Sequence, residues 1–347
     1  MARKTTSLSV LLLVAASLQA GASFAQSAAD FFQRSSLHLI VSASAGGGYD
    51  TMARLVARSM SQHLPGNPAI TVQNMPGAGG VIAVNHLANV APRDGSTFAL
   101  VDRGVLTARI LYGDDSKTQF DSRTFAWLGS VTKEAGVGLF STRSGFKTLE
   151  DAKKGEPAFG VTGLETDPAM YARLLNSLLG TRFKVIPGYA GETEFFQAVE
   201  QGETDGMFAS GWSGPNTVKE LEAYRSGRAV YFIQMARQRL PELPDTPTIL
   251  ELLSSEQDRQ MVDVLLSRLT LGTPFIAPPE VPAERLAILR AAFRATVEDA
   301  DFKREVERQY NHVNPTFPAE AEKLIAGVFA LPPSITDRLR EIVKIAR

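Results

Sequence analysis

The sequence predicts an α/β protein built from two lobes with a ligand cleft between them. Short apolar runs alternate with helical stretches along the chain, a pattern typical of parallel sheets with crossover helices. The 347 residues suit two domains of ordinary size better than one. A hydrophobic content of 44% with 21% charged residues indicates a globular chain with an ample core.

The first set of elements begins with a strand at 37–42 and an amphipathic helix at 50–64, whose N-cap we expect to be Asp50. One helix face carries the apolar residues Met52, Leu55, Val56, Met60 and Leu64. Further along, the pattern predicts strands at 69–73 and 97–101 and a helix at 80–90.

A second set begins near Gly136. It comprises strands at 137–141, 158–161, 184–186, 206–209 and 228–233 and helices at 168–179 and 192–200. We expect Asp167 to cap the first of these helices, Pro168 to lie in its first turn and Gly180 to end it. The tail predicts a strand at 269–276, helices at 283–298 and 319–328, and a final charged helix. We therefore assign 26–134 with 236–347 to lobe 1, and 135–235 to lobe 2.

Residues 1–25 have the pattern of a secretory signal peptide. Arg3 and Lys4 precede an apolar run at 8–14, which is too short to span a bilayer, and small residues flank Phe24 before a cleavage site after Ala25. Cleavage there would release the protein into the periplasm. Removal of Arg3 and Lys4 leaves 34 basic against 37 acidic residues, a balance that favours neither nucleic acid nor an acidic membrane.

The chain contains no cysteine. Disulfides, thiolate metal sites, a cysteine nucleophile and an N-terminal lipid anchor on cysteine are therefore excluded. The four histidines have no metal-ligand spacing, so we expect neither a metal nor a cofactor. We expect a monomer.

The first candidate binding loop is 44–50, Ser-Ala-Gly-Gly-Gly-Tyr-Asp, between a strand and a helix. Its glycines let the backbone approach a ligand closely, and the N–H groups of the following helix would attract a small anion. A glycine run at such a position can also serve the turn alone. A second loop of the same kind, 74–80, favours the binding interpretation, because both would lie at the carboxyl edge of one sheet. Neither loop has the lysine of a Walker motif or the spacing of a dinucleotide site.

Other segments could complete the site. Arg103, after the strand at 97–101, offers a planar fork for a carboxylate, although a salt bridge with a neighbour such as Asp102 is the alternative. Trp212 could wall the cleft or simply belong to the core. On the other lobe, Thr162 and Thr166 could donate hydroxyl hydrogen bonds, whereas Glu165 would repel a carboxylate.

The two glycine loops carry a family resemblance. Residues 45–50 with Ala53-Arg54, the loop 74–80, and the stretch 91–95 resemble the receptors of tripartite tricarboxylate transporters, the Bug proteins. Residues 188–191, 202–205 and 243–248 extend the resemblance through nearly the whole chain after the signal peptide.

The resemblance implies a type II periplasmic-binding-protein fold whose lobes close over the ligand. It also implies binding of a small carboxylate by backbone N–H groups and water, and delivery to a two-subunit membrane permease. The full set of candidate ligand-binding residues is Ser44, Gly47, Gly48, Tyr49, Asp50, Gly77, Ala78, Gly79, Arg103, Thr162, Thr166, Tyr189 and Trp212.

The chain departs from the family pattern at 42–44, Tyr49, Arg103 and Glu165, so the far end of the ligand could be unusual and could carry a positive charge. Two other functions stay open. The protein could report ligand occupancy to a membrane sensor kinase, or it could be a hydrolase that uses Ser213 in 211–215, where the final glycine of a nucleophile elbow is missing.

Overall fold

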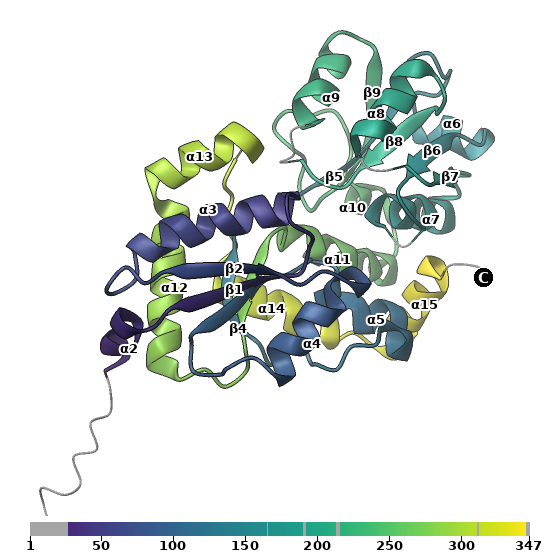
Figure 1. The fold of residues 1–347 in the computed structure, drawn as a ribbon. Coiled ribbons are helices and arrows are strands. Elements are labelled where there is room, and N and C mark those ends of the chain that lie inside the picture. Colours follow the sequence, from purple (N-terminus) through teal and green to yellow (C-terminus); the bar gives the residue numbers. More distant parts are fainter. Residues whose placement is uncertain (1–26, 165, 190–191, 213–215, 311, 345–347) are drawn as a thin grey trace, which may run out of the picture.

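The computed structural model describes residues 27–347 except 165, 190–191, 213–215, 311 and 345–347. The expected signal peptide, Glu165 and Ser213 lie outside the described residues. Two five-stranded sheets, each flanked by helices, form two lobes that Figure 1 shows one above the other. The predicted two-lobed α/β fold is confirmed.

The first sheet has the strand order β2-β1-β3-β10-β4. Its strands are β1 (Leu37–Val41), β2 (Ile70–Asn74), β3 (Thr97–Leu100), β4 (Ala126–Ser130) and β10 (Pro274–Ala277). The helices of this lobe are α2 (Ala28–Arg34), α3 (Gly48–Gln62), α4 (Val81–Asn89), α5 (Ala108–Tyr112), α12 (Ala283–Glu298), α13 (Ala300–Tyr310) and α14 (Pro318–Phe329), with short 3-10 turns η1 (Ala78–Gly80), η2 (Val105–Thr107) and η3 (Gly113–Ser116). β1 pairs in parallel with β2 and β3, so the loops that follow these strands meet at one edge.

The second sheet has the order β7-β6-β8-β5-β9. It comprises β5 (Gly136–Ser141), β6 (Ala158–Val161), β7 (Lys184–Pro187), β8 (Gly206–Ala209) and β9 (Ala229–Met235). Its helices are α6 (Leu149–Lys154), α7 (Asp167–Leu179), α8 (Glu192–Gln201) and α9 (Asn216–Arg225). The short helix α10 (Ile249–Leu252), from the segment predicted for lobe 1, also packs on this sheet. Neither sheet is purely parallel, because β10 and β5 each run antiparallel to both of their neighbours.

The tail differs from the sequence prediction. The strand expected at 269–276 is confined to β10, and its first residues end a helix that the prediction missed, α11 (Glu256–Thr270). Ser255 accepts a hydrogen bond from the backbone N–H of Asp258 at the start of α11, a capping signal visible in the sequence. The helical periodicity of apolar residues is lost here because consecutive residues at 264–269 are all buried, so this half of the helix has no single apolar face.

The lobes share an apolar core. Ile110 and Leu111 of α5 and three residues of α11 pack with Met170 and Leu174 of α7, which belongs to the second sheet's lobe. The last helix, α15 (Pro333–Val343), closes this cluster with Ile335, Leu339 and Val343. Figure 1 shows α7 above α5 and α15, at the junction of the lobes. Burial of these side chains stabilises the lobes in this arrangement.

Among the described residues, no helix has both the length and the apolar character needed to cross a membrane.

Candidate functional site

The first glycine loop is exposed and leads directly into α3. Ser44 to Gly48 are all exposed, Gly46 has a φ of +83°, and α3 begins at Gly48 with Gly47 in the N-cap position. No side chain caps this helix. The entrance of α3 therefore offers backbone N–H groups and the positive end of the helix dipole to an anion.

Asp50 does not cap α3, which starts two residues earlier than predicted. Its buried carboxylate instead accepts hydrogen bonds from Gly46 N (2.9 Å), Arg54 Nε (3.0 Å) and Asn74 Nδ2 (3.0 Å). These bonds, foremost that from Arg54, lower the pKa of Asp50 to about 2 against the opposing effect of burial. Asn74 also donates to the carbonyl of Ala43 (3.0 Å). Asp50 thus holds the first loop in shape and ties it to β2.

The second glycine loop has an unusual backbone. Gly77, Ala78, Gly79 and Gly80 all have positive φ, and Ala78 and Gly79 are exposed. A Cβ at Gly79 would meet no atom within 4 Å, whereas one at Gly80 would lie 3.2 Å from Ser42 Oγ. Gly80 thus packs against the end of β1, and the two glycine loops lie side by side, as the sequence predicted.

Tyr49 connects the first loop to the end of β3 and to the start of β10. Its hydroxyl donates to the carbonyl of Gly272 (3.2 Å) and accepts from the N–H of Arg103 (3.3 Å). Burial, followed by the nearby Asp102, raises the pKa of Tyr49. The hydroxyl therefore stays protonated and serves to hold Arg103 beside the first loop.

Arg103 reaches across to the second lobe. Its Nη2 lies 3.0 Å from Asp167 Oδ2 and 2.7 Å from the carbonyl oxygen of Ser210. Arg268 of α11 approaches the other oxygen of the same carboxylate, with 3.1 Å between its Nη2 and Asp167 Oδ1. We call Arg103, Asp167 and Arg268 the interlobe clasp. All three side chains are between 10% and 13% exposed, so the surrounding protein strengthens their attraction.

Burial alone would raise the pKa of Asp167, but Arg268 and Arg103 hold it below its ordinary value. Asp167 was expected to cap α7. Thr166 is at the N-cap position instead, and Asp167 is the first residue of the helix, with its carboxylate directed to the two arginines. Pro168 in the first turn and Gly180 at the end, with a φ of +71°, are as predicted.

Asp102 lies against the clasp. Its backbone N–H donates to Ser42 Oγ (2.7 Å), and its Oδ1 accepts from the N–H of Gly104 (2.7 Å). Burial raises the pKa of its carboxyl, while Arg268 and Arg103 oppose that rise. A Cβ at Gly104 would lie only 2.3 Å from Arg268 Nη2, so the guanidinium packs directly on this glycine. Arg103 therefore pairs with Asp167 and not with Asp102, the neighbour proposed from the sequence.

The candidate residues of the second lobe serve different roles. Thr162 is exposed in the turn after β6, and Thr166 Oγ1 donates to the carbonyl of Gly163 (2.7 Å). Tyr189 covers Gly160 with its ring and donates its hydroxyl to Glu203 Oε1 (2.6 Å), which raises its pKa to about 12. Trp212 is buried against Tyr231, with ring centroids 5.8 Å apart. The hydroxyl of Tyr189 is thus engaged at the surface by Glu203, and the ring of Trp212 belongs to the interior of this lobe.

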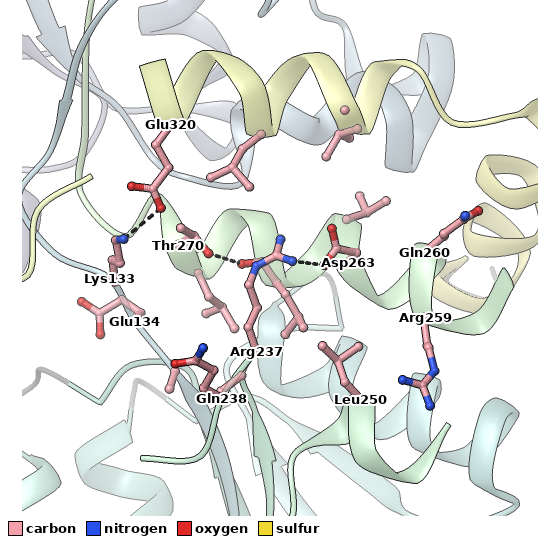
Figure 2. A pocket seen from close by; sticks show the side chains of 18 of the residues that line it. Lys133, Glu134, Arg237, Gln238, Leu250, Arg259, Gln260, Asp263, Thr270 and Glu320 are labelled. Atoms are coloured by element: carbon pink, nitrogen blue, oxygen red, sulfur yellow. Dashed lines mark hydrogen bonds and ion pairs between the residues drawn. The ribbon is translucent and has the colours of Figure 1, made fainter. Parts of the chain in front are cut away.

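A hollow of about 930 Å³ lies between α11, α14 and the segment after β9 (Figure 2). Trp212 belongs to its described lining, but neither glycine loop does. Figure 2 shows Lys133 paired with Glu320 and Arg237 paired with Asp263 across it. Because both basic and acidic side chains line it, the hollow presents no uniform charge to a ligand. The glycine loops remain the better candidate for an anion.

Within the described part of the chain, no group of three or more His, Asp or Glu side chains could hold a metal ion. The residues that sequence reasoning missed are Asp167 and Arg268, which the fold brings to Arg103. Arg268 did carry a signal, because it is the one charged residue in the run 264–271, where five of the other seven residues are valine or leucine. Charged side chains are rarely buried without a partner.

Comparison with known proteins identifies the family. Residues 52–326 match the family described as "Tripartite tricarboxylate transporter family receptor". A UPF0065 protein from the TAR-I ttuE-ttuC' intergenic region of Agrobacterium vitis is 29% identical over 228 residues, which cover 64% of this chain and 62% of that relative.

Two solved structures share the fold. A TctC solute binding protein from Polaromonas has a TM-score of 0.69 at 19% identity, covering 89% of this chain and 98% of its own. MatC from Rhodopseudomonas palustris, solved with bound malate, has a TM-score of 0.59 at 22% identity, covering 90% and 99%.

The chain is therefore a transporter-family receptor by class. It belongs to the tripartite tricarboxylate transporter receptor family, as the glycine-loop motifs indicated.

Proposed function

We propose that this protein is a periplasmic receptor that binds a small carboxylate between its lobes and delivers it to the two-subunit permease of a tripartite transporter. Family membership supports the transport role, and the bound malate of MatC supports a carboxylate as the ligand class. The expected signal peptide supports the periplasmic location.

The observation that carries this proposal is the pair of exposed glycine loops, held side by side at the carboxyl ends of β1 and β2. Each leads into a helix without a side-chain cap. Backbone donors at such a position bind a carboxylate with no need for a lysine or arginine. Gly47, Ala78 and Gly79 would supply the donors on this lobe, with Gly48 next to them. Ser44 and Gly77 would border them, and Thr162 and Thr166 would face them from the other lobe.

Calorimetry of the purified protein against a panel of small organic acids tests the binding role. At least one carboxylate should bind with a dissociation constant in the micromolar range or below, and the matching amide should bind far more weakly, because it lacks the negative charge. Tight binding of a neutral or cationic solute, with no binding of any carboxylate, would contradict the proposal.

Uptake of the bound acid by cells that carry or lack the receptor tests delivery to the permease. Transport should stop without the receptor and return when it is restored. Unchanged uptake, together with a lost transcriptional response to the acid, would instead favour the sensing role considered from the sequence. The mass of the exported protein should correspond to a chain that begins at residue 26.

A further inference from the structure

We propose that Asp167 determines which carboxylates the receptor accepts. Its own carboxylate pairs with Arg103 and Arg268 at the far end of the cleft, where a second carboxylate of a ligand would otherwise bind. The site therefore selects a monocarboxylate and rejects a dicarboxylate. The inference rests on the proposed function, because it assumes that the glycine loops hold one carboxylate.

The clasp is adjacent to both glycine loops. Arg103 donates its N–H to the hydroxyl of Tyr49, the residue that follows Gly48. A Cβ on Gly80 of the second loop would lie 3.4 Å from Cβ of Asp102. The far end of a small ligand anchored at the loops would therefore meet these charged groups.

The acids at this far end already outnumber the two arginines. Arg103 and Arg268 face the carboxylates of Asp167 and Asp102. Glu134, which accepts from the N–H of Trp212 (3.1 Å), is a third acid near Arg103. A second ligand carboxylate here would add a negative charge with no arginine left to pair with it. Uncompensated charges in a buried site are strongly unfavourable.

Asp167 cannot easily yield its place. It is the first residue of α7, and Pro168, Ala169 and Met170, which follow it, are buried. Met170 belongs to the apolar core between the lobes, and its Sδ lies 3.7 Å from Arg268 Nη1. The backbone that carries the carboxylate is therefore fixed. To leave the arginines, the carboxylate must either change rotamer and give up both ion pairs, or move with α7 and disrupt this core. A ligand would have to offset that loss in order to displace it.

The decisive variant is Asp167→Asn, which keeps the shape of the side chain and removes its charge. Calorimetry with two pairs of acids of matched length, butyrate with succinate and hexanoate with adipate, measures the preference. The wild-type protein should favour the monocarboxylate of a pair that fits by about tenfold or more, and Asp167→Asn should shift the ratio toward the dicarboxylate by about tenfold. A wild-type preference for the dicarboxylate, or an unchanged ratio in the variant, would overturn the inference.

Arg268→Met gives an independent test that does not depend on the folding of Asp167→Asn. It leaves the protein's own Asp102, Asp167 and Glu134 with one arginine fewer. The ratio of the two affinities should therefore move further toward the monocarboxylate. If the clasp were purely structural, each variant would lower the affinity for both acids of a pair by the same factor. That result would also overturn the inference. Asp337→Asn is a matched control, since Asp337 is exposed on α15 and pairs only with Arg340 in the described contacts. Its ratio should equal that of the wild type.

The same data separate the two proposals. If no acid binds to the wild type or to any variant, the carboxylate-receptor function fails and the inference fails with it. If acids bind but the ratio does not respond to Asp167, the receptor function stands and only the role of Asp167 is refuted.

Discussion

The two ends of the proposed binding cleft differ in how they can respond to a negative charge. The glycine-loop end is exposed and presents backbone donors, and the carboxylate of Asp50 in the first loop is turned inward to Gly46 and Arg54. At the clasp end, side chains that are nearly buried carry opposite charges already paired with one another. Backbone N–H groups can bind an incoming anion although they carry no charge themselves. A side chain that is already paired must first lose its partner before it can bind the anion. The contrast supports the two proposals, that one end receives a carboxylate and that the other excludes a second one.

The largest expected effect comes from placing a charge at the open end. Gly79→Asp should lower the affinity for a carboxylate by about a hundredfold or more, because it sets a like charge where the anion would bind. The fold should tolerate it, since a Cβ at Gly79 meets nothing within 4 Å and aspartate adopts a φ of +60° more readily than most residues. Calorimetry measures the loss.

Gly227→Asp is the matched control for this prediction. Gly227 has a φ of +73°, is exposed and also has open space around its Cβ position, but it lies in lobe 2 between α9 and β9. Its affinity should match the wild type. Retained affinity in Gly79→Asp would show that the second glycine loop is only a turn.

At the clasp end, the addition of one methyl group should lower the stability of the fold. Gly104→Ala would place a Cβ 2.3 Å from Arg268 Nη2 and 2.9 Å from Asp102 Oδ1. Displacing a buried guanidinium from its carboxylate should cost about 2–4 kcal/mol of unfolding free energy. Urea unfolding measures this change. Gly327→Ala, in helix α14 with open space around it, should instead be neutral or slightly stabilising. Equal stability of Gly104→Ala and the wild type would mean that Arg268 can move freely.

These two regions also differ in how far the sequence could predict them. The glycine loops depend on local chemistry: a short apolar strand, glycines that permit positive φ, and an amphipathic helix that follows. All three are visible in contiguous residues, so the loops and their adjacency were predictable. The role of Asp50 was not, because its partners Arg54 and Asn74 come from two elements and the choice between capping and ion pairing depends on where α3 begins.

The clasp depends on contacts between distant parts of the chain. Arg103 was predicted to be important as a fork for a carboxylate, but the carboxylate that fills it belongs to Asp167 in the other lobe. Asp167 was assigned to its own helix because a local pattern gave it a sufficient role there. Arg268 was overlooked because α11 packs between the lobes and loses the one-sided periodicity that reveals a helix. Local patterns cannot say which of two roles a charged residue takes when the packing of the lobes decides it.

Acidic pH should destabilise the first glycine loop, because it neutralises the carboxylate of Asp50. Asp50 has a pKa of about 2 in the folded protein against an ordinary 3.8, so it stabilises the fold fully above about pH 4 and loses that contribution as the pH falls through 2. Asp50→Asn should therefore cost on the order of 2 kcal/mol between pH 5 and 7, and the difference from the wild type should shrink below pH 4. Urea unfolding at several pH values tests this. A difference that stays constant down to pH 2 would exclude an ionised Asp50 as the cause.

The smallest expected effect concerns Tyr189, which the family motif placed among the ligand-binding residues. Its hydroxyl is already donated to Glu203, in the turn that precedes β8, and its ring covers Gly160 within its own lobe. Tyr189→Phe keeps the ring and removes only that hydrogen bond. The unfolding free energy should fall by about 1 kcal/mol or less, and carboxylate affinity should change less than about twofold. A tenfold loss of affinity in calorimetry would show that the hydroxyl exchanges Glu203 for the ligand on binding, so that the second lobe too would contribute a donor to the open end of the cleft.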